Sequence, residues 1–243
     1  MKKISIIQVI LLSFQSLMAR PLDHLRMCLP LLLFIPFYYL FSEFFKMEFI
    51  QNIHPVMIIV VLVFFEFIIF STIMVGLHRV FLMDDESIAK TKAFRLGVRE
   101  WNFAAWIIKI GLFMIALVVA VNYVFEPLLD KYEYIEYILI APAAYIFARL
   151  SILLPATAVE NRNVSLQEAW KLSKNNGLQL FVLVSVLPYL TDLIMGLISG
   201  YQSIAYQIVI FIIWGVVLIL EVGFLSMCYA WLKGYVDTDS TVD

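Results

Sequence analysis

Six long apolar runs, separated by charged or turn-forming residues, are the main pattern along the chain. Each run supplies the ~20 residues that a helix needs to cross the hydrocarbon core of a bilayer. Backbone groups in lipid must be hydrogen-bonded within the protein, so runs of this length predict transmembrane helices. The predicted spans are residues 25–45, 56–78, 102–125, 134–159, 178–199 and 205–231. We therefore expect an all-α fold, a polytopic membrane helical bundle of six transmembrane helices.

A soluble helical bundle is the alternative to this interpretation. It would require a polar face on most helices, and the first, second and sixth runs have almost none. Composition favours the membrane as well, because 63% of the residues are hydrophobic and only 15% are charged. A soluble domain has roughly 45–50% apolar and about 25% charged residues. Six spans use nearly all of the 243 residues, which leaves no room for a separate soluble domain.

The first 22 residues alternate polar and apolar positions with the period of a helix. The polar positions are Ser5, Gln8, Ser13, Gln15 and Ser16, and the apolar ones are Ile4, Ile7, Ile10, Leu11, Phe14, Leu17 and Met18. This pattern predicts an interfacial amphipathic helix in the headgroup region, with Lys2, Lys3 and Arg20 near anionic lipid. A secretory signal peptide is the competing interpretation. The polar interruptions and the poor cleavage context before Arg20 argue against it.

Lysine and arginine residues of the connections predict the orientation of the chain. One side of the predicted bundle has only Lys46 and Lys131, whereas the other side has most of the remaining basic residues. The side rich in these residues is cytoplasmic in membrane proteins, so we expect both termini there. The transmembrane domain would then cover residues 23–233, followed by a short polar tail, 234–243. A net charge of −2 gives no basic stripe for nucleic acid.

Two cytoplasmic connections are longer than hairpins and resemble each other. One contains the residues AFRLG at 93–97, and the other contains AWKLS at 169–173. We expect an amphipathic connecting helix in each, and the similarity indicates a parallel repeat of two helix pairs. The competing explanation is that any interfacial helix places basic residues beside aromatic ones. Ser165 and Glu168 have the spacing of a capping box, which marks the start of the second connecting helix.

Residues at the predicted cytoplasmic ends of the spans are expected to contact lipid headgroups. Basic side chains beside aromatic ones are typical of the membrane–water interface. The candidate headgroup contacts are His78, Arg79, Arg95, Arg99, Trp170, Lys171 and Lys174.

Five charged residues fall within the predicted spans. They are Glu66, Lys109, Arg149, Asp192 and Glu221. Each costs at least ~2.5–3.5 kcal/mol at the bilayer centre unless it is paired or hydrated, so they should face the interior of the bundle. We expect Arg149 to be neutralised by Glu66 or Glu221, and Lys109 to reach the cytoplasmic interface. Such a network either forms a polar path or ligand cavity, or fixes the order of the helices.

Catalytic signatures are absent from the sequence. There is no glycine-rich phosphate loop, no His-Glu-x-x-His and no Gly-x-Ser-x-Gly, and the three histidines lie in different connections. The two cysteines, Cys28 and Cys228, make neither a disulfide framework nor a metal site. We therefore expect no enzymatic activity, no cofactor and no metal.

The motifs GLHRVFL (76–82), FRLGVREW (94–101), ARLSILLPA (148–156) and SLQEAWKLS (165–173) resemble those of the YciC-like bacterial inner-membrane proteins. They are also similar to the membrane domain ahead of some glycerophosphodiester phosphodiesterases. The resemblance spans most of the chain and implies a six-span helical protein of the bacterial cytoplasmic membrane. It implies no activity, because the catalytic barrel of the hydrolase is a separate domain. Val80 also follows His78-Arg79 where the hydrolase motif has glycine.

These observations lead to an expected function. The leading hypothesis is a non-catalytic envelope module that binds membrane lipids or a protein partner in the membrane. The alternative is a transporter or permease component with a charged intramembrane cavity, and a third, weaker hypothesis is an intramembrane enzyme.

Overall fold

The computed structural model describes residues 3–33, 55–129, 135–159, 164–198 and 204–235. Within these ranges the chain forms helices and connections and contains no strand. The long helices are α5 (Pro55–Leu82), α7 (Val98–Leu129), α8 (Ile135–Leu150) and α13 (Ile204–Lys233). The shorter ones are α1 (Ile6–Ala19), α2 (Pro21–Cys28), α6 (Asp85–Ala89), α9 (Leu153–Val159), α10 (Leu166–Leu172), α11 (Gly177–Phe181) and α12 (Leu187–Ile198). The expected all-α fold is therefore confirmed for the described residues.

Five helical segments are long and apolar enough to cross a membrane: Val60–Leu82, Val98–Phe125, Ile138–Val159, Gly177–Ile198 and Ile208–Lys233. They correspond to the second to sixth predicted spans. Of the first predicted span, only residues 25–33 are described, as the end of α2 and a 3-10 helix, Leu29–Leu33. The remainder of that span lies outside the described residues. The chain is thus an integral, multi-pass membrane protein with five helices able to span a bilayer within the described ranges.

The segment from α11 to α12 is one continuous run that includes a π-helical stretch, Val182–Val186. Pro188 lies just after this stretch and has no N–H to donate to the carbonyl of Val184, four residues earlier. A locally widened turn relieves that mismatch without ending the helix.

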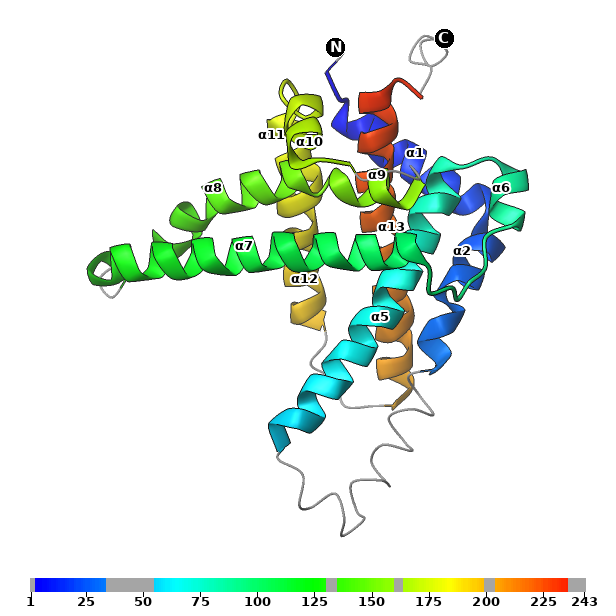
Figure 1. The fold of residues 1–243 in the computed structure, drawn as a ribbon, viewed down its shortest axis with the longest axis horizontal. Helices are drawn as coiled ribbons and strands as arrows, with labels where there is room; N and C mark the ends of the chain where they lie inside the picture. The colour runs from blue at the N-terminus through cyan, green and yellow to red at the C-terminus, as the bar shows by residue number, and fades with distance from the viewer. Residues whose placement is uncertain (1–2, 34–54, 130–134, 160–163, 199–203, 236–243) are drawn as a thin grey trace.

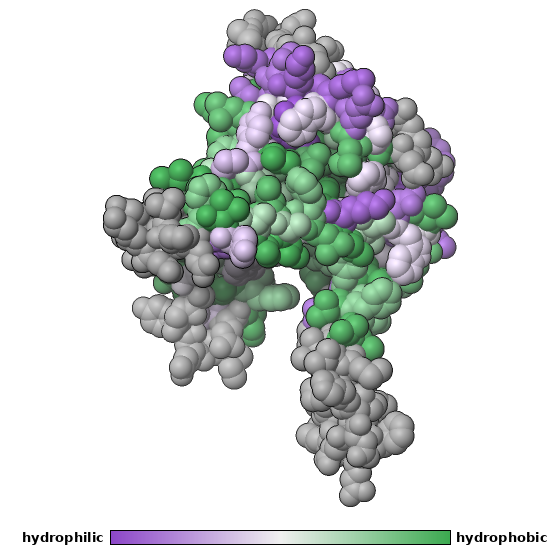
Figure 2. All heavy atoms as spheres, turned by 60° about the vertical axis from the view of Figure 1, so that its left-hand side comes forward, coloured by the Kyte–Doolittle hydropathy of each residue, from purple (hydrophilic) through white to green (hydrophobic). Residues whose placement is uncertain are grey.

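The packed core lies where the carboxyl-terminal halves of α5 and α13 meet α1, α9 and the start of α7. Every residue from Ser71 to His78 is buried there, as is every residue from Val222 to Leu232. By contrast, α7, α12 and the amino-terminal half of α13 expose large apolar side chains such as Ile115, Leu197 and Phe211. Figure 2 shows the polar residues gathered at one end of the molecule, with apolar residues covering the part below. Apolar surface of this extent fits contact with lipid rather than water.

Helices α7 and α8 form an antiparallel pair that projects sideways from α5 and α13 in Figure 1. The pair returns to the core through α9, which packs on both α5 and α7. In this arrangement the pair and the α5–α13 helices have different tilts. The pair begins and ends beside the carboxyl-terminal half of α5. The chain therefore enters α10 at the same end of the bundle at which it left α5.

Helix α1 packs along α13 rather than lying apart from the bundle. The expected exposed apolar stripe is present at Ile7, Leu11, Phe14 and Met18, which follow the helical period. The polar side, however, faces the protein at Ser13, which is fully buried and donates to the carbonyl of Val9 (2.8 Å). A Cβ on the facing Gly223 would lie 3.1 Å from the Cβ of Ser13 and 2.7 Å from the ring of Phe81. Small residues at this crossing therefore allow the close approach of α1 and α13.

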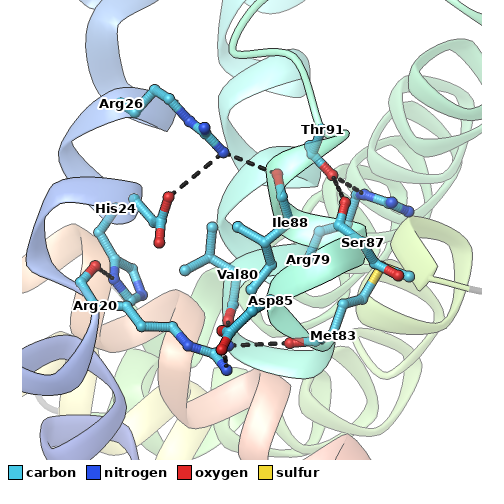
Figure 3. A network of polar contacts seen from close by, with 11 residues as sticks. Arg20, His24, Arg26, Arg79, Val80, Met83, Asp85, Ser87, Ile88 and Thr91 are labelled. Atoms are coloured by element: carbon cyan, nitrogen blue, oxygen red, sulfur yellow. Dashed lines mark hydrogen bonds and ion pairs between the residues drawn. The ribbon is translucent and has the colours of Figure 1, made fainter.

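Two arginines of the α1–α2 segment bind the carboxyl ends of other helices (Figure 3). Arg20 donates to the carbonyls of Val80 (3.2 Å) and Met83 (3.0 Å), at the end of α5. Arg26 donates to the carbonyl of Ile88 (2.8 Å), at the end of α6. The last carbonyls of a helix have no partner within it, so a cation that binds them stabilises the helix end.

His24 lies between these two arginines in sequence and is buried against Phe81, with ring centroids 4.5 Å apart. Its Nδ1 lies 2.8 Å from the carbonyl oxygen of Arg20. Burial lowers the pKa of His24, so the ring stays neutral to lower pH than an exposed histidine does.

Only one of the two expected amphipathic connecting helices is found where the sequence placed it. Residues 93–97 are not helical; the helix in that connection is α6, Asp85–Ala89, which ends before the predicted motif begins. Thr91 ends α6 by donating to the carbonyl of Ser87 (2.9 Å), and Glu100 accepts from the N–H of Gly97 (2.9 Å) at the start of α7. The segment between these two caps is not helical, and the two connections do not form a structural repeat.

Candidate functional site

The second connecting helix, α10, begins at a complete capping box. The Ser165 side chain accepts from the N–H of Glu168 (3.2 Å), and the Glu168 carboxylate accepts from the N–H of Ser165 (3.0 Å). This confirms the predicted start of the helix. A helix of seven residues is too short to be stable alone in water. Its position must therefore come from contacts with the rest of the protein.

Arg149 of α8 supplies the main polar contact that holds α10. Its guanidinium is 6% exposed and donates from Nε to the Ser173 hydroxyl (3.0 Å) and from Nη2 to the Trp170 carbonyl (2.6 Å). The same group lies 3.4 Å from the centroid of the Trp170 ring. A cation at the carboxyl end of α10 also interacts favourably with the helix dipole. Hydrogen bonds, stacking and charge therefore converge on one side chain.

Helices α7, α8 and α10 enclose an apolar groove with a volume of ≈ 890 Å³. Its lining residues are Trp106, Lys109, Ile110, Phe113, Ile146, Leu150, Leu166, Gln167, Trp170 and Lys171. We call this the α10 groove. Most of this lining is aliphatic or aromatic, and only Lys109, Gln167 and Lys171 add polar groups. Pockets that bind small molecules have this composition, an apolar interior with few polar groups.

The two lysines of the α10 groove come from different helices. Lys109 is exposed on α7, and its Nζ lies 4.7 Å from the centroid of the Trp106 ring. Lys171 is exposed on α10, next to Trp170. A cation over an aromatic face is attracted to the ring and still presents its charge to a ligand. The groove therefore combines apolar surface with positive charge.

The expected ion pair of Arg149 is not present. Among the described residues no ion pair joins Arg149 to Glu66 or Glu221. Glu221 accepts instead from the Thr191 hydroxyl (3.1 Å), Glu66 is half-buried on α5, and Asp192 is exposed on α12. The prediction considered only carboxylates as partners, whereas one backbone carbonyl and one hydroxyl bind this arginine. The five charges therefore do not form one network.

His78 does not contact headgroups. It is 2% exposed in the core, its Nδ1 lies 2.7 Å from the Ser226 hydroxyl, and it packs against Phe103 with ring centroids 5.7 Å apart. The prediction placed His78 at a helix end, but α5 continues to Leu82 and carries this ring into the contact with α13 and α7. Its role is to join the three helices.

Five of the other six candidate headgroup residues lie at two separate pockets. Trp170 and Lys171 line the α10 groove, whereas Lys174 is exposed beyond α10 and does not line it. Arg79, Arg95 and Arg99 line a small polar pocket at the end of α5 and the start of α7. The candidate headgroup contacts predicted from the sequence thus came from separate parts of the structure.

A partly open cleft of ≈ 360 Å³ lies between α5, α7, α8, α12 and α13. Its polar lining residues are His78, Ser151 and Glu221, and neither Arg149 nor Glu66 lines it. It is therefore not the charged cavity that the sequence predicted.

Residues that the sequence interpretation did not assign to the site include Trp106, Phe113 and Gln167. Trp106 and Lys109 are three residues apart, which places them on one face of a helix. That spacing can be read from the sequence, but it does not reveal that α10 lies across the groove from this face of α7. Among the described residues no group of three or more His, Cys, Asp or Glu side chains could hold a metal ion.

No protein-family model, no curated protein and no solved structure matches the chain. The resemblance to the YciC-like proteins therefore remains a prediction from the sequence motifs.

Proposed function

We propose that this protein is a non-catalytic module of the bacterial cytoplasmic membrane that binds one anionic phospholipid in the α10 groove. The observation that carries the proposal is the composition of the groove. Its interior is apolar over a volume of ≈ 890 Å³, and the two lysines supply positive charge beside it. An acyl chain matches the first property, and a negatively charged headgroup matches the second.

The electrostatic contribution of the two lysines favours an anionic over a neutral lipid. Each lysine near an anionic membrane surface contributes about 1 kcal/mol, so the two lysines together favour an anionic lipid by more than tenfold. The exposed Leu166 and Trp170 add apolar contact along α10, and tryptophan is typical of the depth at which headgroups lie. Arg149 supports this site indirectly, because it holds α10 in place.

The packing of α1 supports a topology with both termini on the same side of the membrane, which the distribution of lysine and arginine in the sequence predicts to be the cytoplasmic side. The carboxyl-terminal halves of α5 and α13 lie together through His78 and Ser226, and α1 contacts the same region at Gly223. The amino end of α5 is therefore at the opposite end from α1 (Figure 1). One crossing between α1 and α5 would bring the number of spans to six, and tags at the two ends should then report the same compartment.

Removing the charge of the groove tests the proposed function. The double variant Lys109→Gln, Lys171→Gln should bind an anionic phospholipid about thirtyfold more weakly, because both attractive charges, about 1 kcal/mol each, are lost. Native mass spectrometry of the detergent-purified protein, titrated with phosphatidylglycerol and with phosphatidylcholine, measures this.

Lys3→Gln, Lys174→Gln is the matched control, since it removes the same charge from exposed positions that do not line the groove. The control should keep the preference for phosphatidylglycerol. Equal loss in both double variants, or no preference in the wild type, would show that the groove is not an anionic-lipid site.

A further inference from the structure

A second cationic site lies apart from the α10 groove, where α5 ends and α7 begins. Its lining residues are Thr72, Val75, Gly76, Arg79, Lys90, Thr91, Lys92, Arg95, Arg99 and Glu100. We call it the arginine pocket. Five of these side chains are cationic and one is a carboxylate, and none of them lines the α10 groove.

Arg79 is held in a fixed position within this pocket. Its Nε donates to the Thr91 hydroxyl (3.0 Å), as Figure 3 shows, and its Nη1 lies 3.5 Å from the Ala158 carbonyl. Thr91 is itself fixed by its bond to the Ser87 carbonyl (2.9 Å). Nη2 of Arg79 makes no hydrogen bond within the described part of the chain, so a guanidinium donor is available in a prearranged geometry.

The positive charge of the pocket is only partly balanced. Lys90 pairs with Glu86 (2.5 Å), and the Glu100 carboxylate accepts from the N–H of Gly97 (2.9 Å). Arg95 and Lys92 make no ion pair within the described ranges, and the Nε of Arg95 lies near Gly97 at the same pocket. Cations gathered around a concave site raise the local potential and attract an anion.

Size and position restrict the kind of anion. The pocket has a volume of ≈ 30 Å³, which is room for about one water-sized group. A terminal phosphate oxygen has that size, and the other oxygens would then face Arg95 and Lys92 at the opening. Thr72, Val75 and Gly76 extend the lining into the last turns of the α5 span, so the pocket lies at the end of a helix that can cross a membrane. Arginine and lysine donors to phosphate oxygens form the stronger, charge-assisted class of hydrogen bond.

We infer that the arginine pocket binds a terminal phosphate group, either free or as the headgroup of a lipid such as phosphatidate. Arg79 would hold the inserted oxygen, and Arg95 and Lys92 would bind the outer oxygens. The site is separate from the α10 groove and does not depend on the function proposed for it.

Binding of two probes tests this inference and distinguishes the two sources. Purified protein is titrated with inorganic phosphate against chloride at equal ionic strength, and protein in phosphatidylcholine nanodiscs is compared with and without phosphatidate, with thermal unfolding as the readout. At least one probe should stabilise the wild type. Stabilisation by phosphate identifies a soluble ligand, and stabilisation by phosphatidate alone identifies a lipid headgroup. The double variant Lys92→Gln, Arg95→Gln should weaken that response about tenfold or more, because two charge-assisted contacts are lost.

Two controls keep the result interpretable. Lys92 and Arg95 are exposed, so the variant should fold like the wild type, which its unfolding in chloride checks. Lys109→Gln, Lys171→Gln alters only the α10 groove and should keep the full response to inorganic phosphate. With phosphatidate, which the α10 groove would also attract, this variant should keep the part of the response that Lys92→Gln, Arg95→Gln loses. If neither probe stabilised the wild type, or if the wild type and Lys92→Gln, Arg95→Gln responded equally, the inference would be overturned.

Discussion

Arg149→Ala is expected to destabilise the protein by about 3 kcal/mol and to release α10. The change removes two hydrogen bonds from a buried guanidinium, each worth about 1.5–3 kcal/mol for a charged donor, and leaves the Trp170 carbonyl with only the longer bond from the Ser173 hydroxyl (3.3 Å). It also removes the stacking on the Trp170 ring. Because α10 has only seven residues, it cannot keep its position without these contacts. Thermal unfolding in detergent measures the stability, and proteolysis between α9 and α10 measures the release.

Double-mutant cycles distinguish this arrangement from an ion-pair network. Arg149→Ala should couple to Ser173→Ala, its hydrogen-bond partner, and should be additive with Glu66→Ala and with Glu221→Ala within about 0.5 kcal/mol. Arg149→Lys keeps the charge but not the forked geometry and should restore only part of the stability. Coupling of Arg149 to either glutamate, with none to Ser173, would restore the ion-pair interpretation.

Arg20→Ala is expected to cost about 2–3 kcal/mol and to loosen the α5–α6 connection. The side chain donates to two carbonyls at the end of α5 and also pairs with Asp85 (2.7 Å). Loss of a charged donor leaves the Val80 and Met83 carbonyls unsatisfied beside α2. Hydrogen exchange of the amides from Met83 to Ile88 should become faster, and the unfolding temperature should fall.

Asp85→Asn is the matched control for Arg20. The Asp85 side chain is 88% exposed, and exposed ion pairs contribute about 0–1 kcal/mol. The control should therefore behave almost like the wild type. If Asp85→Asn proved as damaging as Arg20→Ala, the ion pair rather than the carbonyls would hold α2 in place.

The sequence predicted those features that depend on local pattern. Runs of apolar residues identified the five spanning helices, because the length of a span is set by the thickness of the bilayer. The capping box identified the start of α10, because its two bonds join the side chains of Ser165 and Glu168 to backbone groups three residues apart. The exposed stripe of α1 followed the helical period in the same way.

Features that depend on tertiary packing were not predictable from these patterns. Arg149 binds Trp170 and Ser173, more than twenty residues away, and every helix end offers carbonyls that a sequence does not distinguish. His78 lies one turn before the end of α5, so its burial depends on where α13 and α7 pack. The α10 groove brings Lys109 and Lys171 together from two helices, and the sequence placed them in separate groups.

Photo-crosslinking from inside the groove tests the lipid-binding proposal most directly. p-Benzoylphenylalanine is placed either at Phe113, which lines the α10 groove, or at the neighbouring Leu112, which is exposed and does not line it. After irradiation in the native membrane, the lipids attached at each position are identified by mass spectrometry. The position of Phe113 should yield lipids enriched in anionic phospholipid, whereas that of Leu112 should yield the composition of the membrane. The same lipid composition at both positions would contradict a groove that selects an anionic lipid.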